Sequence, residues 1–180
     1  MTASPLLLMS KEEMQETLER LAGQIAERHP DCAGLVLVGI QRRGADLARR
    51  LRALILAACG HEPPIADLDI NLYRDDWTST AHMPVITPSH IPVDITGKTI
   101  LLVDDVLFTG RTIRAALEAL LDFGRPSRVE LLAFVDRGHR ELPIQADFTG
   151  RTIHTERREH INVCLAERDG ADGVFLAQNS

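Results

Sequence analysis

The chain has 180 residues, of which 44% are hydrophobic, and a formal net charge of −6. This length predicts one domain, residues 1–180, with a sizeable core, and the acidic balance excludes a globally basic nucleic-acid binder. The apolar runs are far shorter than the roughly 20 residues of a membrane helix, and three widely spaced cysteines predict neither a disulfide framework nor a zinc site, so a reducing, cytoplasmic location is expected.

The first predicted element is an amphipathic helix that ends near Arg28. Ser10 and Glu13 have the spacing of a capping box, and apolar residues then recur every three or four positions. Residues 35–40 are continuously apolar and precede a polar turn with a glycine, which is typical of a buried parallel strand. Residues 45–58 again have the periodicity of a helix.

The next segments continue this alternation after one long interruption. Residues 65–73 are predicted to form a strand, whereas the polar residues 74–92, rich in Pro, Ser and Thr, predict a long loop. Such a loop inside a compact domain is often an active-site lid. A strand at 99–103, a helix at 110–123 and a strand at 129–135 follow.

After Asp136 only short strand-like pieces are recognisable, near 161–165 and 174–177. Strands that alternate with helices predict an α/β protein. The expected architecture is a doubly wound, mostly parallel sheet with helices on both faces and a long flexible loop.

The most informative stretch is residues 100–112. An apolar strand ends there in two carboxylates, Asp104 and Asp105, before a Thr-Gly-Arg-Thr turn opens a helix. In an open α/β sheet, ligands bind beyond the carboxyl ends of the strands, and a helix N-terminus attracts phosphate. Gly110 lets the backbone approach an anion, and the two threonine hydroxyls add donors. Carboxylates beside a phosphate site suit ribose hydroxyls or a magnesium-bound diphosphate.

Taken alone, this turn is also compatible with an ordinary helix in which Thr109 is the N-cap and the two acids merely end a strand. The complete stretch resembles the phosphoribosyl-pyrophosphate motif of type I phosphoribosyltransferases, which consists of a hydrophobic run, two acids and a Thr-Gly turn. The resemblance extends along the chain to the family of the bifunctional pyrimidine operon attenuation regulator and uracil phosphoribosyltransferase. Five blocks occur in that family's order: residues 37–44, 69–76, 91–96, 100–112 and 135–144.

This resemblance implies a type I phosphoribosyltransferase fold with a small hood of short strands, assembled as a homodimer or a larger homo-oligomer. It implies an enzyme that joins uracil to 5-phosphoribosyl pyrophosphate with Mg²⁺ and gives UMP and diphosphate. In many members it also implies binding to the leader RNA of pyrimidine operons.

Individual residues fit the parts of such a reaction. Arg42, Arg43 and Gly44 directly follow a buried strand, so two cations and a flexible backbone are placed to hold the departing diphosphate. Arg74 opens the long loop, and a lid that carries an arginine can close over the diphosphate and exclude water. Arg137 follows the last core strand, beside the phosphate turn, where it can read the edge of a pyrimidine.

The candidate catalytic residues are therefore Asp104, Asp105 and Arg74. Mg²⁺ is expected near the two acids through the diphosphate and the ribose, without a directly assigned protein ligand. The expected substrate-binding residues are Arg42, Arg43, Gly44, Val106, Leu107, Phe108, Thr109, Gly110, Arg111, Thr112, Arg137 and Ile161.

Other basic residues are candidates for RNA contact, because across a dimer they can combine into one positive face. They are Arg20, Arg28, His139, Arg140, Arg151, Arg157 and Arg158. The chain departs from the family at Phe108, where Tyr is usual, and at Arg42, where Thr is common. Glu156 also adds negative charge to the segment that the resemblance associates with RNA. The same basic residues are compatible with a scattered, solvated surface.

Three alternatives remain. A non-catalytic regulator would keep the fold, sense a nucleotide and bind RNA, although both acids and Arg74 are present here. A salvage transferase for a purine base is compatible with the phosphate turn, whereas residues 135–144 favour a pyrimidine. A receiver domain also has paired acids, but it places them after its first strand and needs no Thr-Gly turn.

Overall fold

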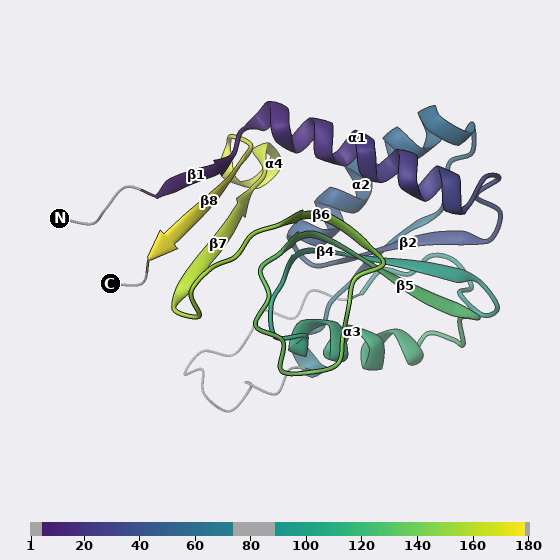
Figure 1. Cartoon of the computed structure of the whole chain (residues 1–180). Coiled ribbons are helices and arrows are strands. Elements are labelled where there is room, and N and C mark those ends of the chain that lie inside the picture. The colour runs from purple at the N-terminus through teal and green to yellow at the C-terminus, as the bar shows by residue number, and fades with distance from the viewer. Residues whose placement is uncertain (1–4, 74–88, 179–180) are drawn as a thin grey trace.

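The computed structural model describes residues 5–73 and 89–178, and its centre is a five-stranded sheet in the order β3-β2-β4-β5-β6 (Figure 1). Every neighbouring pair of strands in this sheet is parallel. The strands are β2 (Leu35–Ile40), β3 (Ile65–Leu68), β4 (Thr99–Leu107), β5 (Arg128–Asp136) and β6 (Phe148–Thr152). The carboxyl ends of all five therefore lie at one edge of the sheet, where α/β proteins bind their ligands.

Helices cover both faces of this sheet, as the sequence predicts (Figure 1). One face packs against α1 (Lys11–Arg28) and α2 (Arg43–Cys59), and the other against α3 (Arg111–Leu121). The predicted capping box at the start of α1 is confirmed, with Ser10 Oγ accepting the Glu13 N–H at 3.2 Å. No helix in these two described ranges is long and apolar enough to cross a membrane.

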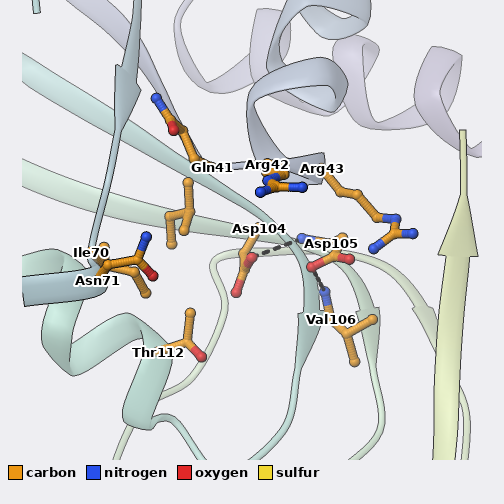
Figure 2. Close-up of a pocket in the computed structure, with 11 residues that line it drawn as sticks. Gln41, Arg42, Arg43, Ile70, Asn71, Asp104, Asp105, Val106 and Thr112 are labelled. Carbon is orange, nitrogen blue, oxygen red and sulfur yellow. Dashed lines mark hydrogen bonds between the residues drawn. The ribbon is translucent and has the colours of Figure 1, made fainter. Parts of the chain in front are cut away.

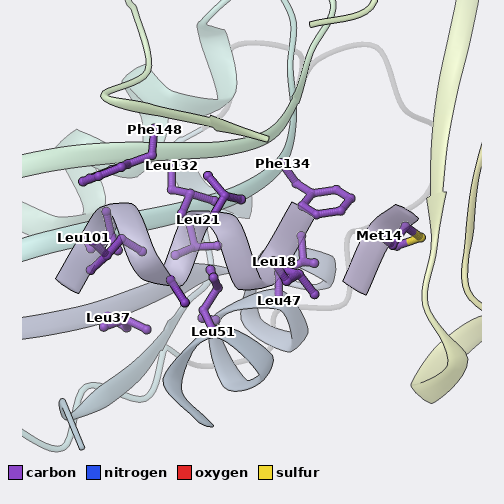
Figure 3. Packing of buried hydrophobic residues seen from close by; sticks show 14 of the residues in the cluster. Met14, Leu18, Leu21, Leu37, Leu47, Leu51, Leu101, Leu132, Phe134 and Phe148 are labelled. Carbon is purple, nitrogen blue, oxygen red and sulfur yellow. The ribbon is translucent and has the colours of Figure 1, made fainter. Parts of the chain in front are cut away.

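The apolar runs of the strands are continuous because the sheet is buried on both faces. In β4, Leu101 and Val103 join the cluster beneath α1 and α2, whereas Ile100 and Leu102 join the cluster beneath α3. Figure 3 shows how the two helices and the strands interlock in the first cluster. Its labelled side chains are Met14, Leu18, Leu21, Leu37, Leu47, Leu51, Leu101, Leu132, Phe134 and Phe148.

A smaller antiparallel sheet, the hood, joins the two ends of the described chain (Figure 1). Its order is β1-β8-β7, with β1 (Leu6–Met9), β7 (Glu159–Cys164) and β8 (Gly173–Gln178). The connection between β7 and β8 contains the short helix α4 (Ala166–Asp169). Charge pairs fasten this connection to α2: Arg43 to Asp169, Arg50 to Glu167 and Asp172, and Arg168 to Asp46. The hood is therefore held against the start of α2, next to the carboxyl edge of the central sheet.

The structure corrects several sequence-based bounds. β4 continues through Leu107 instead of ending at 103, because β5 pairs with it as far as Asp136. The predicted strand 65–73 ends at Leu68, since Asp69 Oδ1 accepts the Asn71 N–H at 2.8 Å and begins a 3₁₀ turn. α2 begins two residues before the predicted 45.

Two strands have no clear sequence signal. β6 and β1 are short, and their pairing partners, β5 and β8, are supplied by other parts of the chain. Their formation depends on tertiary contacts more than on local pattern. The loop predicted at 74–92 lies largely outside the described residues, apart from its end, where His90 forms an isolated bridge with Asp67.

Candidate active site

The turn after β2 supplies the first side chains of the site. The strand ends at Ile40, the chain turns through Gln41 and Arg42, which are joined by a cis peptide bond, and α2 begins at Arg43. The first N–H groups of a helix have no partner within it, and the helix dipole is positive at this end. With the exposed side chain of Arg42, the turn can attract an anion.

Gly44 lets the start of α2 lie directly against β4. A Cβ on this residue would collide with the carbonyl oxygen of Val103 and would lie 3.3 Å from the Asp104 Cα. The requirement for glycine here is therefore close packing of two backbones. As a result, the turn after β2 and the carboxylates of β4 line the same space.

Asp104 and Asp105 lie within β4, where each carboxylate accepts a hydrogen bond from the following backbone N–H (Figure 2). The distances are 3.0 Å from Asp105 N to Asp104 Oδ1 and 2.9 Å from Val106 N to Asp105 Oδ1. Burial raises the pKa of Asp105, while these hydrogen bonds and the charge of Arg43 act in the opposite direction. Asp105 therefore retains a proton at a higher pH than an ordinary aspartate.

The turn between β4 and α3 is built around Gly110, whose φ of 92° is in the region that favours glycine. Thr109 Oγ1 accepts the Arg111 N–H at 3.3 Å, so this hydroxyl stabilises the turn itself. The Arg111 side chain pairs with Glu141 at 2.8 Å. Thr112, in the first turn of α3, is the residue of this segment that lines the cavity.

A cavity of about 270 Å³ brings these separate segments together (Figure 2). This volume is close to the lower end of the range for small-molecule pockets. Its lining combines two cations, two acids, a helix N-terminus and a threonine hydroxyl, a set suited to a phosphorylated sugar. The lining residues are Ile40, Gln41, Arg42, Arg43, Gly44, Ile70, Asn71, Asp104, Asp105, Val106 and Thr112.

Gln41, Ile70 and Asn71 line this cavity although they are not among the expected substrate-binding residues. Ile70 and Asn71 come just after β3, which neighbours β2 in the sheet. Side chains that follow neighbouring parallel strands gather at one edge, so a correct end for β3 would have identified both. The predicted strand 65–73 placed them inside a strand instead.

Several expected substrate-binding residues lie outside the lining of this cavity. Leu107 is buried in the core beneath α3, and Ile161, in β7, belongs to the core beneath α1 and α2. Thr109, Gly110 and Arg111 form the adjoining turn. Arg74, the expected lid arginine, lies outside the described residues.

Phe108 and Arg137 form a separate group beside the turn. The Arg137 guanidinium lies 4.0 Å from the centre of the Phe108 ring, and the His139 ring meets that ring edge-on at 5.9 Å. Arg137 is 3% exposed and donates from Nε to Thr155 Oγ1 at 3.1 Å and from Nη2 to the Glu156 carbonyl at 2.9 Å. Burial lowers the pKa of this guanidinium. The group therefore stacks a guanidinium on an aromatic ring next to the turn between β4 and α3.

The residues expected to contact RNA lie on α1, on β6 and in the connections after β5 and β6, and they engage other parts of the chain. Arg20 donates to the Gly150 carbonyl, and Arg28 contacts Asp147 and stacks on Phe148. The remaining contacts join Arg140 to Asp136, Arg151 to Glu13, Arg157 to Glu141, Arg158 to Glu156 and His139 to the Thr155 carbonyl. Acidic partners therefore offset much of the positive charge that this set would present.

Comparisons with known proteins agree with one another. A family model described as the phosphoribosyl transferase domain matches residues 9–168. The bifunctional protein PyrR of Elusimicrobium minutum is 52% identical over 170 residues, which cover 94% of this chain and 95% of the relative. The protein of the same name from Thermus thermophilus is 52% identical over 169 residues, covering 94% of this chain and 93% of the relative.

Solved structures show the same architecture. The hypoxanthine phosphoribosyltransferase of Trypanosoma cruzi superposes with a TM-score of 0.73 at 13% identity, over 97% of each chain. A hypoxanthine-guanine phosphoribosyltransferase of Bacillus anthracis gives a TM-score of 0.67 at 19% identity, over 96% of this chain and 97% of the other. At such identities the likeness shows the shared fold.

Proposed function

Because the chain belongs to the phosphoribosyl transferase domain family and has the type I fold of these pentosyltransferases, we propose that it makes UMP and diphosphate from uracil and 5-phosphoribosyl pyrophosphate. The observation that carries this proposal is the cavity shared by Arg42, Gly44, Asp104, Asp105 and Thr112. It offers separate places for a phosphate, a ribose and a diphosphate at the carboxyl edge of one parallel sheet. Free thiols and phosphorylated substrates suit a cytoplasmic location.

Each part of the cavity takes one part of the substrate. The turn from Thr109 to Thr112 binds the 5-phosphate with N–H groups of α3 and the Thr112 hydroxyl. Asp104 and Asp105 accept hydrogen bonds from the ribose hydroxyls, and the start of α2 with Arg42 holds the diphosphate. Arg43 adds positive charge while its Nη2 donates to Asp169 at 3.1 Å.

The reaction forms a bond from uracil N1 to the anomeric carbon and breaks the bond from that carbon to the diphosphate oxygen. The diphosphate leaves with the electron pair of this bond, and N1 loses its proton. Positive charge develops on the ribose as the diphosphate leaves, so both carboxylates stabilise the transition state electrostatically. We assign the two acids to sugar binding and charge stabilisation, and we assign Arg74, which lies outside the described residues, to covering the diphosphate.

Mg²⁺ suits this donor set as a companion of the substrate. Among residues 5–73 and 89–178, no group of three or more acidic, histidine or cysteine side chains is arranged to hold a metal. Mg²⁺ would be held through the diphosphate and the ribose, near the two neighbouring carboxylates, because this ion commonly keeps substrate and water ligands. Bound there, the ion would offset the negative charge of the diphosphate, and Asp104 and Asp105 would lie beside it.

The uracil ring is proposed to lie beside Phe108 and Arg137. The direct test measures UMP formed by the purified full chain from uracil, phosphoribosyl pyrophosphate and Mg²⁺. Parallel reactions contain hypoxanthine, guanine, orotate or adenine instead of uracil. The proposal is supported if uracil is the only one of these bases that gives a nucleotide product. A preference for a purine base would assign the chain to another salvage reaction.

Removal of the Thr112 hydroxyl tests the phosphate site. Thr112→Val is expected to weaken phosphoribosyl pyrophosphate and UMP binding together by about tenfold, the usual effect of losing a hydrogen bond to a charged group. Gly110→Ala should act in the same direction, because a side chain is strained at a φ of 92°. Calorimetric titration measures both ligands, with Thr152→Val, at an exposed position of β6, as the matched control. UMP binding at full strength in both site variants would place the phosphate elsewhere.

We further propose that the chain regulates pyrimidine genes by UMP-dependent binding to leader RNA, as a homodimer or larger homo-oligomer. The name shared by its relatives, bifunctional protein PyrR, supports a second activity. The basic residues on α1, on β6 and after β5 are the candidates, although each already contacts an acidic or carbonyl group. Assembly of two copies would bring more of them onto one face.

RNA binding has a distinctive expected signature. Affinity for a pyrimidine-operon leader should fall as salt rises, because contacts with phosphates release bound counterions. UMP should strengthen the binding, and the RNA should then strengthen UMP binding by the same factor. A gel-shift titration with leader and scrambled RNA, with and without UMP, measures both effects. Equal affinity for the two RNAs would leave a salvage enzyme without specific regulation.

A further inference from the structure

Two of the three cysteines are neighbours in space although 27 positions separate them in the sequence. The Cys32 and Cys59 sulfur atoms lie 2.8 Å apart, and both residues are free thiols. Cys32 is in the turn between α1 and β2, and Cys59 is the last residue of α2. Cys164, the third cysteine, is in β7 of the hood.

The surroundings of these two sulfur atoms differ. Cys32 is fully buried, and its Sγ also donates to the His29 carbonyl at 3.3 Å. Burial, together with the neighbouring Cys59 and Asp31, raises the pKa of Cys32 to about 12. Cys59 is only partly buried, and its Sγ donates to the His61 carbonyl at 3.6 Å. Cys59 is therefore the sulfur that an oxidant in solution reaches first, and Cys32 is the protected partner behind it.

We propose that Cys32 and Cys59 are a redox modification site that closes into an intramolecular disulfide when the protein meets a peroxide. Cys59 sulfur attacks one peroxide oxygen, the O–O bond breaks, and water leaves, so that Cys59 becomes a sulfenic acid. Cys32 sulfur then attacks Cys59 sulfur, the S–S bond forms and the S–O bond breaks, releasing a second water. In total, two thiols lose two electrons and two protons to hydrogen peroxide, which is reduced to two molecules of water.

Proximity compensates for the low reactivity of Cys32. Two groups held in contact react with a high effective concentration, so the second step needs little thiolate at Cys32. Further oxidation of Cys59 is suppressed for the same reason, because a resolving thiol already touches it. A reductant of the thiol class reopens the bond by exchange.

The disulfide would link the turn before β2 to the end of α2, and β2 and α2 carry part of the candidate active site. The closed ring contains β2, α2 and the turn between them, and residues 40–44 of this ring line the cavity. Cys32 precedes β2 and Gly44 follows it, so the sulfur pair lies at the opposite end of this strand from the cavity. The disulfide should therefore stabilise the fold, chiefly by restricting the unfolded chain, without changing the geometry of the site.

The experiment treats the full chain with hydrogen peroxide, denatures it, alkylates the remaining thiols and maps the peptides by mass spectrometry. A peptide that joins Cys32 to Cys59 is expected, with Cys164 alkylated, and subsequent treatment with dithiothreitol should remove the link. The thermal midpoint of the oxidised protein is expected to exceed that of the reduced protein by about 5 °C or more.

Single substitutions separate this pair from other oxidation. Cys59→Ser should abolish both the linked peptide and the rise in the thermal midpoint, whereas Cys164→Ser should keep both. Because Cys32 is buried, Cys32→Ser is informative only where it folds, and Cys59→Ser is the deciding variant. Three alkylated cysteines after oxidation, or a link that uses Cys164 or a second chain, would overturn the proposal. None of these outcomes depends on the transferase or RNA activities.

Discussion

Asp104→Asn and Asp105→Asn are each expected to lower uracil phosphoribosyltransferase activity by at least about tenfold, since roughly 1.4 kcal/mol of lost transition-state stabilisation is sufficient for that. Both carboxylates line the cavity, and both belong to the rigid strand β4. An amide of the same shape keeps the packing but removes the negative charge that faces the developing ribosyl cation. The measurement is kcat/KM for phosphoribosyl pyrophosphate under saturating uracil.

The pH profile gives Asp105 a second signature. Because burial raises its pKa, the acid limb of kcat/KM should lie above the ordinary aspartate value of about 4. This limb should disappear or move to lower pH in Asp105→Asn. Asp105 has a higher pKa in the folded chain than in the unfolded chain, so its protonated form adds to the free energy of unfolding at low pH. This contribution is lost as the pH rises from the unfolded pKa through the folded pKa. At neutral pH the folded chain must bury an ionised carboxylate, which is unfavourable, whereas an amide is uncharged. Asp105→Asn should therefore not lower the free energy of unfolding.

This combination of lost activity and retained stability distinguishes a catalytic role from a structural one. Glu27→Gln, which neutralises an exposed carboxylate on α1, is the matched control and should behave as the unmodified chain in both measurements. Unchanged rates in Asp104→Asn and Asp105→Asn would remove these acids from the proposed mechanism. A large fall in stability with the activity loss would instead show that the charge supports the fold.

Gly44→Ala is expected to have the largest effect on activity, with kcat/KM falling by about 100-fold, as for a displacement of catalytic groups by about 1 Å. The added Cβ would collide with the Val103 carbonyl oxygen, which belongs to the backbone of a central strand and cannot rotate away. The start of α2 must move outward, and Arg42 and the helix N–H groups move with it. Loss of diphosphate binding, measured by product inhibition, should accompany the loss of rate.

Gly23→Ala is the control for this substitution. Gly23 is also within a helix, and a Cβ built there meets nothing within 4 Å. Alanine has the higher helix propensity, so this variant should be slightly more stable and fully active. If Gly44→Ala bound phosphoribosyl pyrophosphate as the unmodified chain does, the close approach of α2 to β4 would have no role in the site.

The sequence by itself determined the alternation of strands and helices. It also indicated the two acids and the Thr-Gly turn as candidate site residues. Continuous apolar runs at 35–40 and 100–103 have the length of strands and alternate with helical segments, so they predict a parallel sheet with helices on both faces. The Thr-Gly turn after Asp104 and Asp105 predicts a phosphate site because the relevant chemistry is local: a strand end, two acids and a helix start adjoin in the chain.

The distances between those segments were decided by tertiary structure. Asn71 enters the cavity because β3 pairs with β2, and the pattern of residues 65–73 does not show which strand will be its neighbour. β1 and β6 are too short to signal themselves and form because β8 and β5 offer them unpaired edges. Likewise, Arg43 reaches Asp169 and Cys32 touches Cys59 only after the chain has folded. Contacts between residues far apart in sequence depend on the packing of whole elements, and local periodicity does not record that packing.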